Sequence, residues 1–119
     1  MKVVKMVEYG EYPEAPVGGL GGFFGNGMRW EDYVSAYKEK DKVAPYLEAI
    51  REYVLEHKIK QGGDWHQNDE EGTFLFDDGT APEFSFRAWG DLMAAIWSSE
   101  ENKDYSYMDF YMEGWGVLE

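Results

Sequence analysis

The sequence lacks cysteine and contains only two histidines, His57 and His66. Without cysteine there is no disulfide framework, no thiolate metal site and no cysteine nucleophile, and the composition fits a reducing, cytoplasmic location. Neither histidine has a nucleophile or carboxylate partner at a recognised spacing, and the GxSxG and HExxH patterns are missing. We therefore expect a protein that is not an enzyme and that uses no cofactor.

Long apolar runs are missing as well. No stretch approaches the roughly 18 apolar residues of a membrane span, and residues 1–7 are too short and too interrupted by lysine for a signal peptide. We expect no membrane contact. At 119 residues the chain suits a single domain, and a core of this size is stable without disulfides or structural metals.

Basic residues are scarce in one half of the chain. Residues 1–60 carry 10 acids and nine bases, a net charge of −1, whereas residues 61–119 carry 14 acids against Arg87 and Lys103, a net charge of −12. These sum to the −13 of the whole chain. An excess of this kind disfavours direct binding to nucleic acid and attracts basic partners.

Two ligand motifs can be tested by spacing, and both fail. After Gly19 and Gly21 the third glycine of a GxGxxG phosphate loop is replaced by Phe24. An EF-hand loop starting at Asp64 has unsuitable residues at its third, sixth and twelfth positions. We expect no specific metal site, although the sequence leaves open whether His57 and His66 converge.

Residues 72–98 carry the strongest structural signals. The alternation in 73–76 and 83–87 predicts two strands, and the Asp-Gly pair in 77–82 favours a turn that joins them as a β-hairpin. A helix follows whose apolar stripe recurs with helical spacing. We expect that stripe, which comprises Trp89, Leu92, Met93, Ile96 and Trp97, to pack on the phenylalanine face of the hairpin.

The remaining segments complete an α+β prediction. We expect a strand over 3–9, an irregular Gly/Pro-rich loop over about 10–27 that its aromatic residues pin to the domain, helices near 29–39 and 43–57, and strands over 59–66 and 105–112. In the last strand, Met108 and Phe110 are expected in the core. The architecture is then a small antiparallel sheet of three to five strands with two to three helices packed on one face.

The charge distribution predicts a function. Between residues 61 and 82 there are six acids and no base, which favours a small acidic inhibitor that occupies a basic, nucleic-acid-binding surface of a partner. Nuclease or defence-complex inhibitors of the anti-restriction, anti-CRISPR or toxin-immunity type act in this way. The partner-binding residues predicted are Asp64, Asp69, Glu70, Glu71, Asp77, Asp78, Glu100, Glu101, Asp104, Asp109, Tyr105, Tyr107 and Tyr111.

An alternative stays open. An exposed face of tyrosine and tryptophan, with Tyr105, Tyr107 and Tyr111 on one side of the predicted last strand, suits a non-catalytic adaptor or a ligand-binding module. The acidic composition also has a plain explanation in solubility. The sequence does not identify the partner, the strand order or the oligomeric state.

Overall fold

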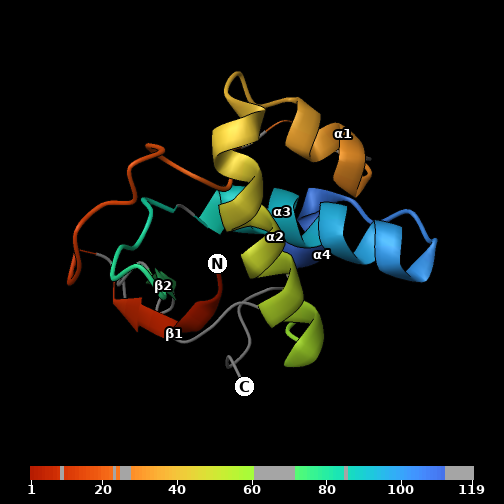
Figure 1. The fold of residues 1–119 in the computed structure, drawn as a ribbon. Helices are drawn as coiled ribbons and strands as arrows, with labels where there is room; N and C mark the ends of the chain where they lie inside the picture. The colour runs from red at the N-terminus through yellow and green to blue at the C-terminus, as the bar shows by residue number, and fades with distance from the viewer. Residues whose placement is uncertain (9, 23, 25–27, 61–71, 85, 112–119) are drawn as a thin grey trace.

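The computed structural model describes residues 1–8, 10–22, 24, 28–60, 72–84 and 86–111. In that part of the chain an antiparallel sheet of two strands is combined with four helices (Figure 1). The elements are β1 (Val3–Glu8), α1 (Trp30–Ser35), α2 (Lys40–Glu56), β2 (Gly72–Phe76), α3 (Phe86–Glu101) and α4 (Tyr107–Tyr111). The α+β class is thus confirmed, with fewer strands in the described residues than the three to five expected.

The sheet pairs the start of the sequence with a segment of its second half and is not a hairpin. Strand β1 runs antiparallel to β2, with Val3 opposite Phe76 and Glu8 opposite Gly72. The register shifts between Val3 and Lys5, so Val4 is an extra, bulged residue. The bulge brings Val3 and Met6, rather than Val3 and Val7, against the core, and Val4 is 55% exposed.

The predicted β-hairpin over 73–87 is wrong, although its first strand and its turn exist. The turn closes through the Gly79 backbone N–H, which donates to the Phe76 carbonyl at 3.0 Å, and Gly79 has the positive φ of 84° that glycine accommodates. Beyond Pro82 the chain does not return along β2. Helix α3 starts at Phe86, inside the segment expected as the second strand.

Helix α3 forms the centre of the core. All five residues of its predicted stripe are buried, and so are the side chains on its other faces from Ala88 to Ser98. Phe74 of β2 stacks on Trp89 at 6.0 Å between ring centroids, which confirms that the stripe packs on the phenylalanine face. Phe76 meets Tyr46 of α2 edge-on at 4.8 Å, so α2 covers the same strand.

Helices α1 and α2 confirm the two helices predicted over 29–57. Helix α2 begins at Lys40 instead of near Val43, and Pro45 therefore lies inside it rather than in its first turn. Its C-terminus is closed by Lys58, whose φ is 53°, and by the Ile59 N–H, which donates to Val54 at 3.0 Å. The strand expected over 59–66 falls mostly outside the described residues.

The strand predicted over 105–112 is also wrong, because residues 107–111 form helix α4. Ser106 and Asp109 form one half of a capping box: the Asp109 carboxylate accepts the Ser106 backbone N–H at 2.7 Å and its hydroxyl at 3.2 Å, while the Asp109 N–H donates to the Ser106 carbonyl at 3.1 Å. The helix buries Phe110 as expected, but Met108 is 40% exposed. This local capping signal outweighs the two-residue alternation that predicted a strand.

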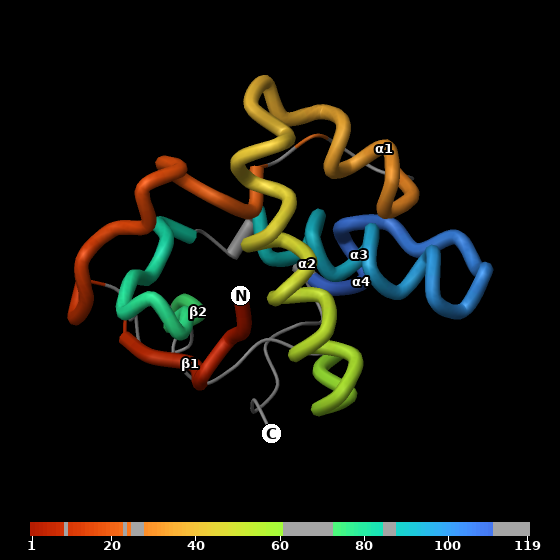
Figure 2. The backbone as a smooth tube through the Cα atoms, in the orientation of Figure 1, coloured from red at the N-terminus to blue at the C-terminus, as the bar shows by residue number. Residues whose placement is uncertain are grey.

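The glycine-rich loop runs along the segment that follows β2 (Figure 2). The Ala15 N–H donates to the Ala81 carbonyl at 3.0 Å, and the Ala81 N–H donates to the Pro13 carbonyl at 2.8 Å. Further along, Leu20 is buried and Phe24 packs edge-on against Tyr33 and Tyr37. The described part of this loop is therefore pinned to the core, as its aromatic residues predicted.

Candidate functional site

The residues predicted to bind a partner are not all described by the structure. Asp64, Asp69, Glu70 and Glu71 lie outside the described residues, as does the side chain of Tyr111. The other predicted residues fall into two regions. One is the turn after β2, and the other is the C-terminal end of α3 together with α4.

In the turn after β2, Asp77 and Asp78 have different surroundings. Asp78 accepts the Thr80 backbone N–H at 2.9 Å, the Thr80 hydroxyl at 2.5 Å and the Tyr46 hydroxyl at 3.0 Å. The hydrogen bonds from Thr80 favour the ionised form and lower the pKa of Asp78. Asp78 thus fastens the turn to α2, whereas Asp77 is exposed beside it and forms no ion pair with any described side chain.

Further exposed acids lie on β1 and on the two segments that the backbone pairs beyond it, and the sequence analysis did not select them. Glu14 pairs with Ala81 in a parallel bridge, and the Glu83 carbonyl accepts the Leu20 N–H at 3.3 Å. We call the exposed acids of β1, the glycine-rich loop and residues 77–83 that form no ion pair with described side chains the sheet-end acids. They are Glu8, Glu11, Glu14, Asp77 and Glu83.

Two described bases lie beside or on β1, next to the sheet-end acids. Lys5 is exposed on β1, and Lys2 is 3.2 Å from Glu52 of α2. A signal for this surface was present in the sequence: residues 10–27 contain Glu11 and Glu14 and no base. The signal was hidden because the net charge of residues 1–60 also counts the lysines of the helices.

At the C-terminal end of α3, Glu101 is held by a base and a tyrosine. Its carboxylate accepts a hydrogen bond from the Lys60 ammonium at 2.8 Å and another from the Tyr105 hydroxyl at 2.5 Å. The hydrogen bond from Lys60 has the larger effect and, with the bond from Tyr105, lowers the pKa of Glu101. The same bond to Glu101 raises the pKa of Lys60. The negative charge of Glu101 is therefore balanced by Lys60 of the same chain.

The other acids predicted in this region are mostly engaged as well. Arg29 donates to the Asp104 carboxylate at 2.7 Å and to the Ser98 carbonyl, which joins the start of α1 to the end of α3. Asp109 caps α4. Glu100 is exposed and forms no ion pair among the described side chains.

The predicted tyrosine face does not lie on a strand. Tyr105 and Tyr107 are half-buried, and the Tyr105 ring packs edge-on against Phe110 at 5.3 Å. The Lys103 ammonium lies 4.9 Å from the centre of the Tyr105 ring. Tyr105 thus belongs to a mixed cluster of rings, lysines and Glu101 at the end of α3.

A buried acid that the sequence analysis did not select lies in the middle of α3. Asp91 is 1% exposed and accepts the Phe24 backbone N–H at 2.6 Å. Burial raises its pKa, and the bond from Phe24 only partly offsets this effect. A single acid within the apolar stretch of residues 88–97 was the available signal. Its hydrogen bond to Phe24 holds the glycine-rich loop against α3.

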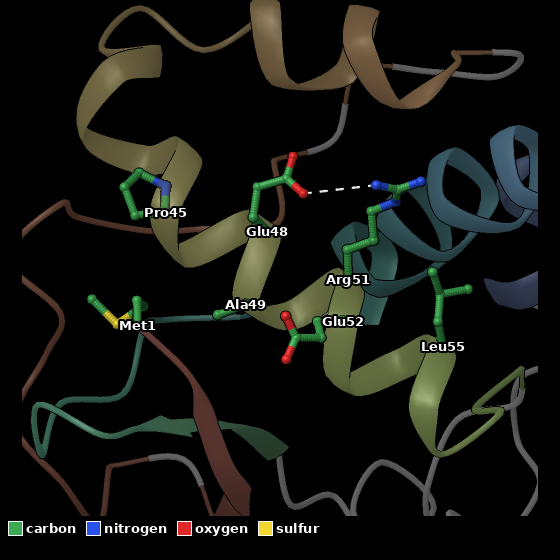
Figure 3. Close-up of a pocket in the computed structure, with 7 residues that line it drawn as sticks. All are labelled: Met1, Pro45, Glu48, Ala49, Arg51, Glu52 and Leu55. Atoms are coloured by element: carbon green, nitrogen blue, oxygen red, sulfur yellow. Dashed lines mark ion pairs between the residues drawn. The ribbon is translucent and has the colours of Figure 1, made fainter.

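An open hollow of about 490 Å³ lies on the outer side of α2 (Figure 3). Its acids are already engaged: Glu48 accepts the Trp30 indole N–H at 2.7 Å and lies 3.7 Å from Arg51, and Glu52 pairs with Lys2. Glu48, Glu52 and Glu56 are all exposed on this helix. None of the predicted partner-binding residues that the structure describes lines this hollow.

The described residues contain no group of three or more histidine, cysteine or acidic side chains placed to hold a metal ion. None of their helices has both the length and the apolar composition required to cross a bilayer.

Comparison with known proteins gives no family assignment. No protein-family model matches the chain, and no curated protein or solved structure shows significant similarity to it.

Proposed function

We propose that the protein is a small acidic inhibitor that uses its sheet-end acids to occupy a basic, nucleic-acid-binding surface of a partner, such as a nuclease or a defence complex. The observation that carries the proposal is the contrast in pairing. Glu8, Glu11, Glu14, Asp77 and Glu83 are exposed without an ion pair among the described side chains. Glu101 and Asp104 at the end of α3 are instead bound to bases of the same chain.

An exposed carboxylate without a counter-ion projects its electric field into solvent. In an ion pair, the positive charge of the base offsets most of that field. The screening length is about 8–10 Å at physiological salt, so neighbouring carboxylates on one surface add their attraction for a basic partner and raise the association rate. Carboxylates can thereby take the place of phosphates on a surface that normally binds nucleic acid.

Backbone hydrogen bonds support the arrangement of these acids. Those between residues 13–15 and Ala81, and between Leu20 and Glu83, fix the two segments relative to each other. Less conformational entropy is then lost on binding than for a free acidic tail. The turn with Asp77 is fastened by the bonds of Asp78 to Thr80 and Tyr46.

The experiment begins with an affinity capture from lysate of the native source at low and high salt, followed by identification of the captured protein. We expect a basic nucleic-acid-binding enzyme that is released at high salt and displaced by DNA or RNA. The triple variant Glu11→Lys, Glu14→Lys and Glu83→Lys should then lose binding by at least about 100-fold, since buried or closely matched charge pairs are each worth one or more kcal/mol.

A matched variant separates the surface from the total charge. The control is a second triple variant at exposed positions of α1 and α2, which changes the net charge by the same amount as the first: Glu31→Lys, Asp32→Lys and Glu56→Lys. We expect it to bind nearly as well as the native chain. Equal losses in both variants, or a captured partner whose binding ignores salt, would contradict the proposal.

A further inference from the structure

The ammonium group of Lys60 lies in a site built from two rings and a carboxylate. It is 2.8 Å from Glu101, 4.6 Å from the centre of the Trp97 ring and 5.8 Å from the centre of the Tyr105 ring. A ring face and a carboxylate both attract a cation, through the ring quadrupole and through direct charge. The three groups therefore form a cation site that the chain fills with its own lysine.

The groups around Lys60 are held by contacts that do not involve Lys60. The Trp97 indole N–H donates to the Ile59 carbonyl at 2.8 Å, and Trp97 is only 7% exposed. The Tyr105 hydroxyl donates to Glu101 at 2.5 Å, and the Tyr105 backbone N–H donates to Ser98 Oγ at 2.9 Å. These bonds keep the rings and the carboxylate in place when the lysine leaves.

Lys60 is able to leave. Its side chain is 42% exposed, and exposed ion pairs contribute little to stability. An open cavity of about 400 Å³ adjoins the site, with Leu55 and Trp97 as its apolar wall and Glu100 and Glu101 as its acids. A cationic chain that enters along Leu55 thus finds an apolar path and then a carboxylate, while Lys60 moves into solvent.

We propose that Trp97, Tyr105 and Glu101 form a receiving site for a lysine- or arginine-type cationic side chain of a protein partner, and that Lys60 occupies this site in the free protein. The cation displaces Lys60 and takes over its contacts with Glu101 and the two rings. None of its residues belongs to the sheet-end acids. Its test needs no partner protein, so either proposal can fail without the other.

The test uses n-butylammonium, which reproduces the end of a lysine side chain, as the probe. Its binding is followed by the NMR shift of the Trp97 indole N–H in the native protein and in Lys60→Ala. We expect Lys60→Ala to bind the probe roughly tenfold more tightly, because the tethered lysine competes in the native chain at an effective concentration in the millimolar range. n-Butanol, which has the same chain without the charge, should not bind.

Lys58→Ala is the matched control. Lys58 lines the same cavity but forms no ion pair with a described side chain, so its removal changes the net charge equally and leaves Lys60 in the site. We expect Lys58→Ala to bind the probe like the native protein. Adding Glu101→Gln to Lys60→Ala should cancel the gain.

Several outcomes overturn the proposal. Equal probe affinity in Lys60→Ala and the native chain means that no cation site remains when the lysine is removed. Equal gains in Lys58→Ala and Lys60→Ala mean that only net charge matters. Where Lys60→Ala fails to fold by circular dichroism, Lys60→Gln is measured with the same expectations and the same overturning results.

Discussion

At the sheet end of the molecule, Glu11, Glu14 and Glu83 face solvent without a counter-charge among the described side chains, whereas Glu101 and Asp104 at the end of α3 each bind a base. The bases come from distant parts of the chain: Lys60 is 41 residues from Glu101, and Arg29 is 75 residues from Asp104. The fold thus moves positive charge from the first half of the sequence onto the acids of the second. Charge counted along the sequence does not predict where the field is strongest.

The comparison predicts that the two regions respond differently to mutation. Changes at the end of α3 remove bonds that hold helices together, so they should lower stability. Changes among the sheet-end acids should leave stability nearly unchanged and alter binding alone. Among the acidic side chains considered, the buried Asp91 is expected to contribute most to the free energy of unfolding.

The largest effect on stability is expected for Asp91→Ala. It leaves the Phe24 N–H without its acceptor and should lower the free energy of unfolding by about 1–3 kcal/mol, measured by urea denaturation. Asp91→Asn retains an acceptor oxygen without a buried charge and should be neutral or stabilising. A loss in Asp91→Asn as large as in Asp91→Ala would contradict this assignment.

The pH dependence of the same variants tests the cause of the raised Asp91 pKa. The folded state binds the proton more tightly than the unfolded state, so this group makes the protein more stable as pH falls through the raised pKa toward the ordinary value of 3.8. Asp78, whose pKa is lowered, contributes in the opposite sense and loses its stabilisation as pH falls below that value. The difference in unfolding free energy between the native protein and Asp91→Asn should therefore shrink in acid.

A second, smaller loss of stability is expected for Arg29→Ala. Arg29 joins the Ser98 carbonyl to Asp104, and its removal should cost about 1–2 kcal/mol in thermal or chemical unfolding, because hydrogen bonds to charged groups are among the stronger ones. Arg29→Lys keeps the charge without the planar fork and should recover only part of the loss. Full recovery in Arg29→Lys would show that charge alone matters here.

The capping box of α4 should contribute about 1 kcal/mol. Ser106→Ala removes a hydroxyl that bonds Asp109, and Asp109→Ala removes the acceptor of the Ser106 N–H. Hydrogen exchange of residues 107–110 should accelerate in Asp109→Ala, while Asp109→Glu, the usual residue of this motif, should retain protection. Unchanged exchange in Asp109→Ala would mean that packing of Phe110 alone holds α4.

The smallest effect on stability is expected for the sheet-end acids. Glu11→Lys, Glu14→Lys and Glu83→Lys should each change the free energy of unfolding by no more than about 0.5 kcal/mol, as exposed positions without partners do. The same change at Glu101, which bonds Lys60 and Tyr105, should lower the melting temperature more. Equal losses at Glu14 and Glu101 would remove the distinction between the two regions.

Local signals predicted much of the fold. The buried stripe of α3 follows from its helical period. Asn102, a residue type that accommodates the left-handed conformation, ends this helix with a φ of 50°, and the Lys103 N–H donates to the Ser98 carbonyl at 3.2 Å. The turn at Gly79 follows from its Asp-Gly pair. Each of these features is determined within about 10 residues of sequence.

The errors arose where a local pattern had two explanations or a distant partner. Phe74 and Phe76 alternate because β2 is a strand, but its partner is β1 rather than the next segment. Tyr105 to Met112 alternate in polarity by chance, while Ser106 and Asp109 carried the helix signal that was overlooked.

The candidate site was predicted less well than the fold. Asp77 was selected correctly as an exposed acid, but Glu14 and Glu83 become neighbours only through pairing of segments about 70 residues apart. Lys60 and Arg29 neutralise acids that the sequence treats as free. Pairings of this kind depend on tertiary structure, and no local pattern in one sequence contains them.

The pairing of β1 with β2 also determines the order in which the chain can fold during synthesis. Val3 pairs with Phe76, a separation of 73 residues. At a translation rate of roughly 5–20 residues per second, β1 waits on the order of 4–15 seconds for its partner strand. During that interval its apolar side chains lack their partner strand, and Lys2 and Lys5 place charge beside them, which is the arrangement that disfavours aggregation of an apolar strand.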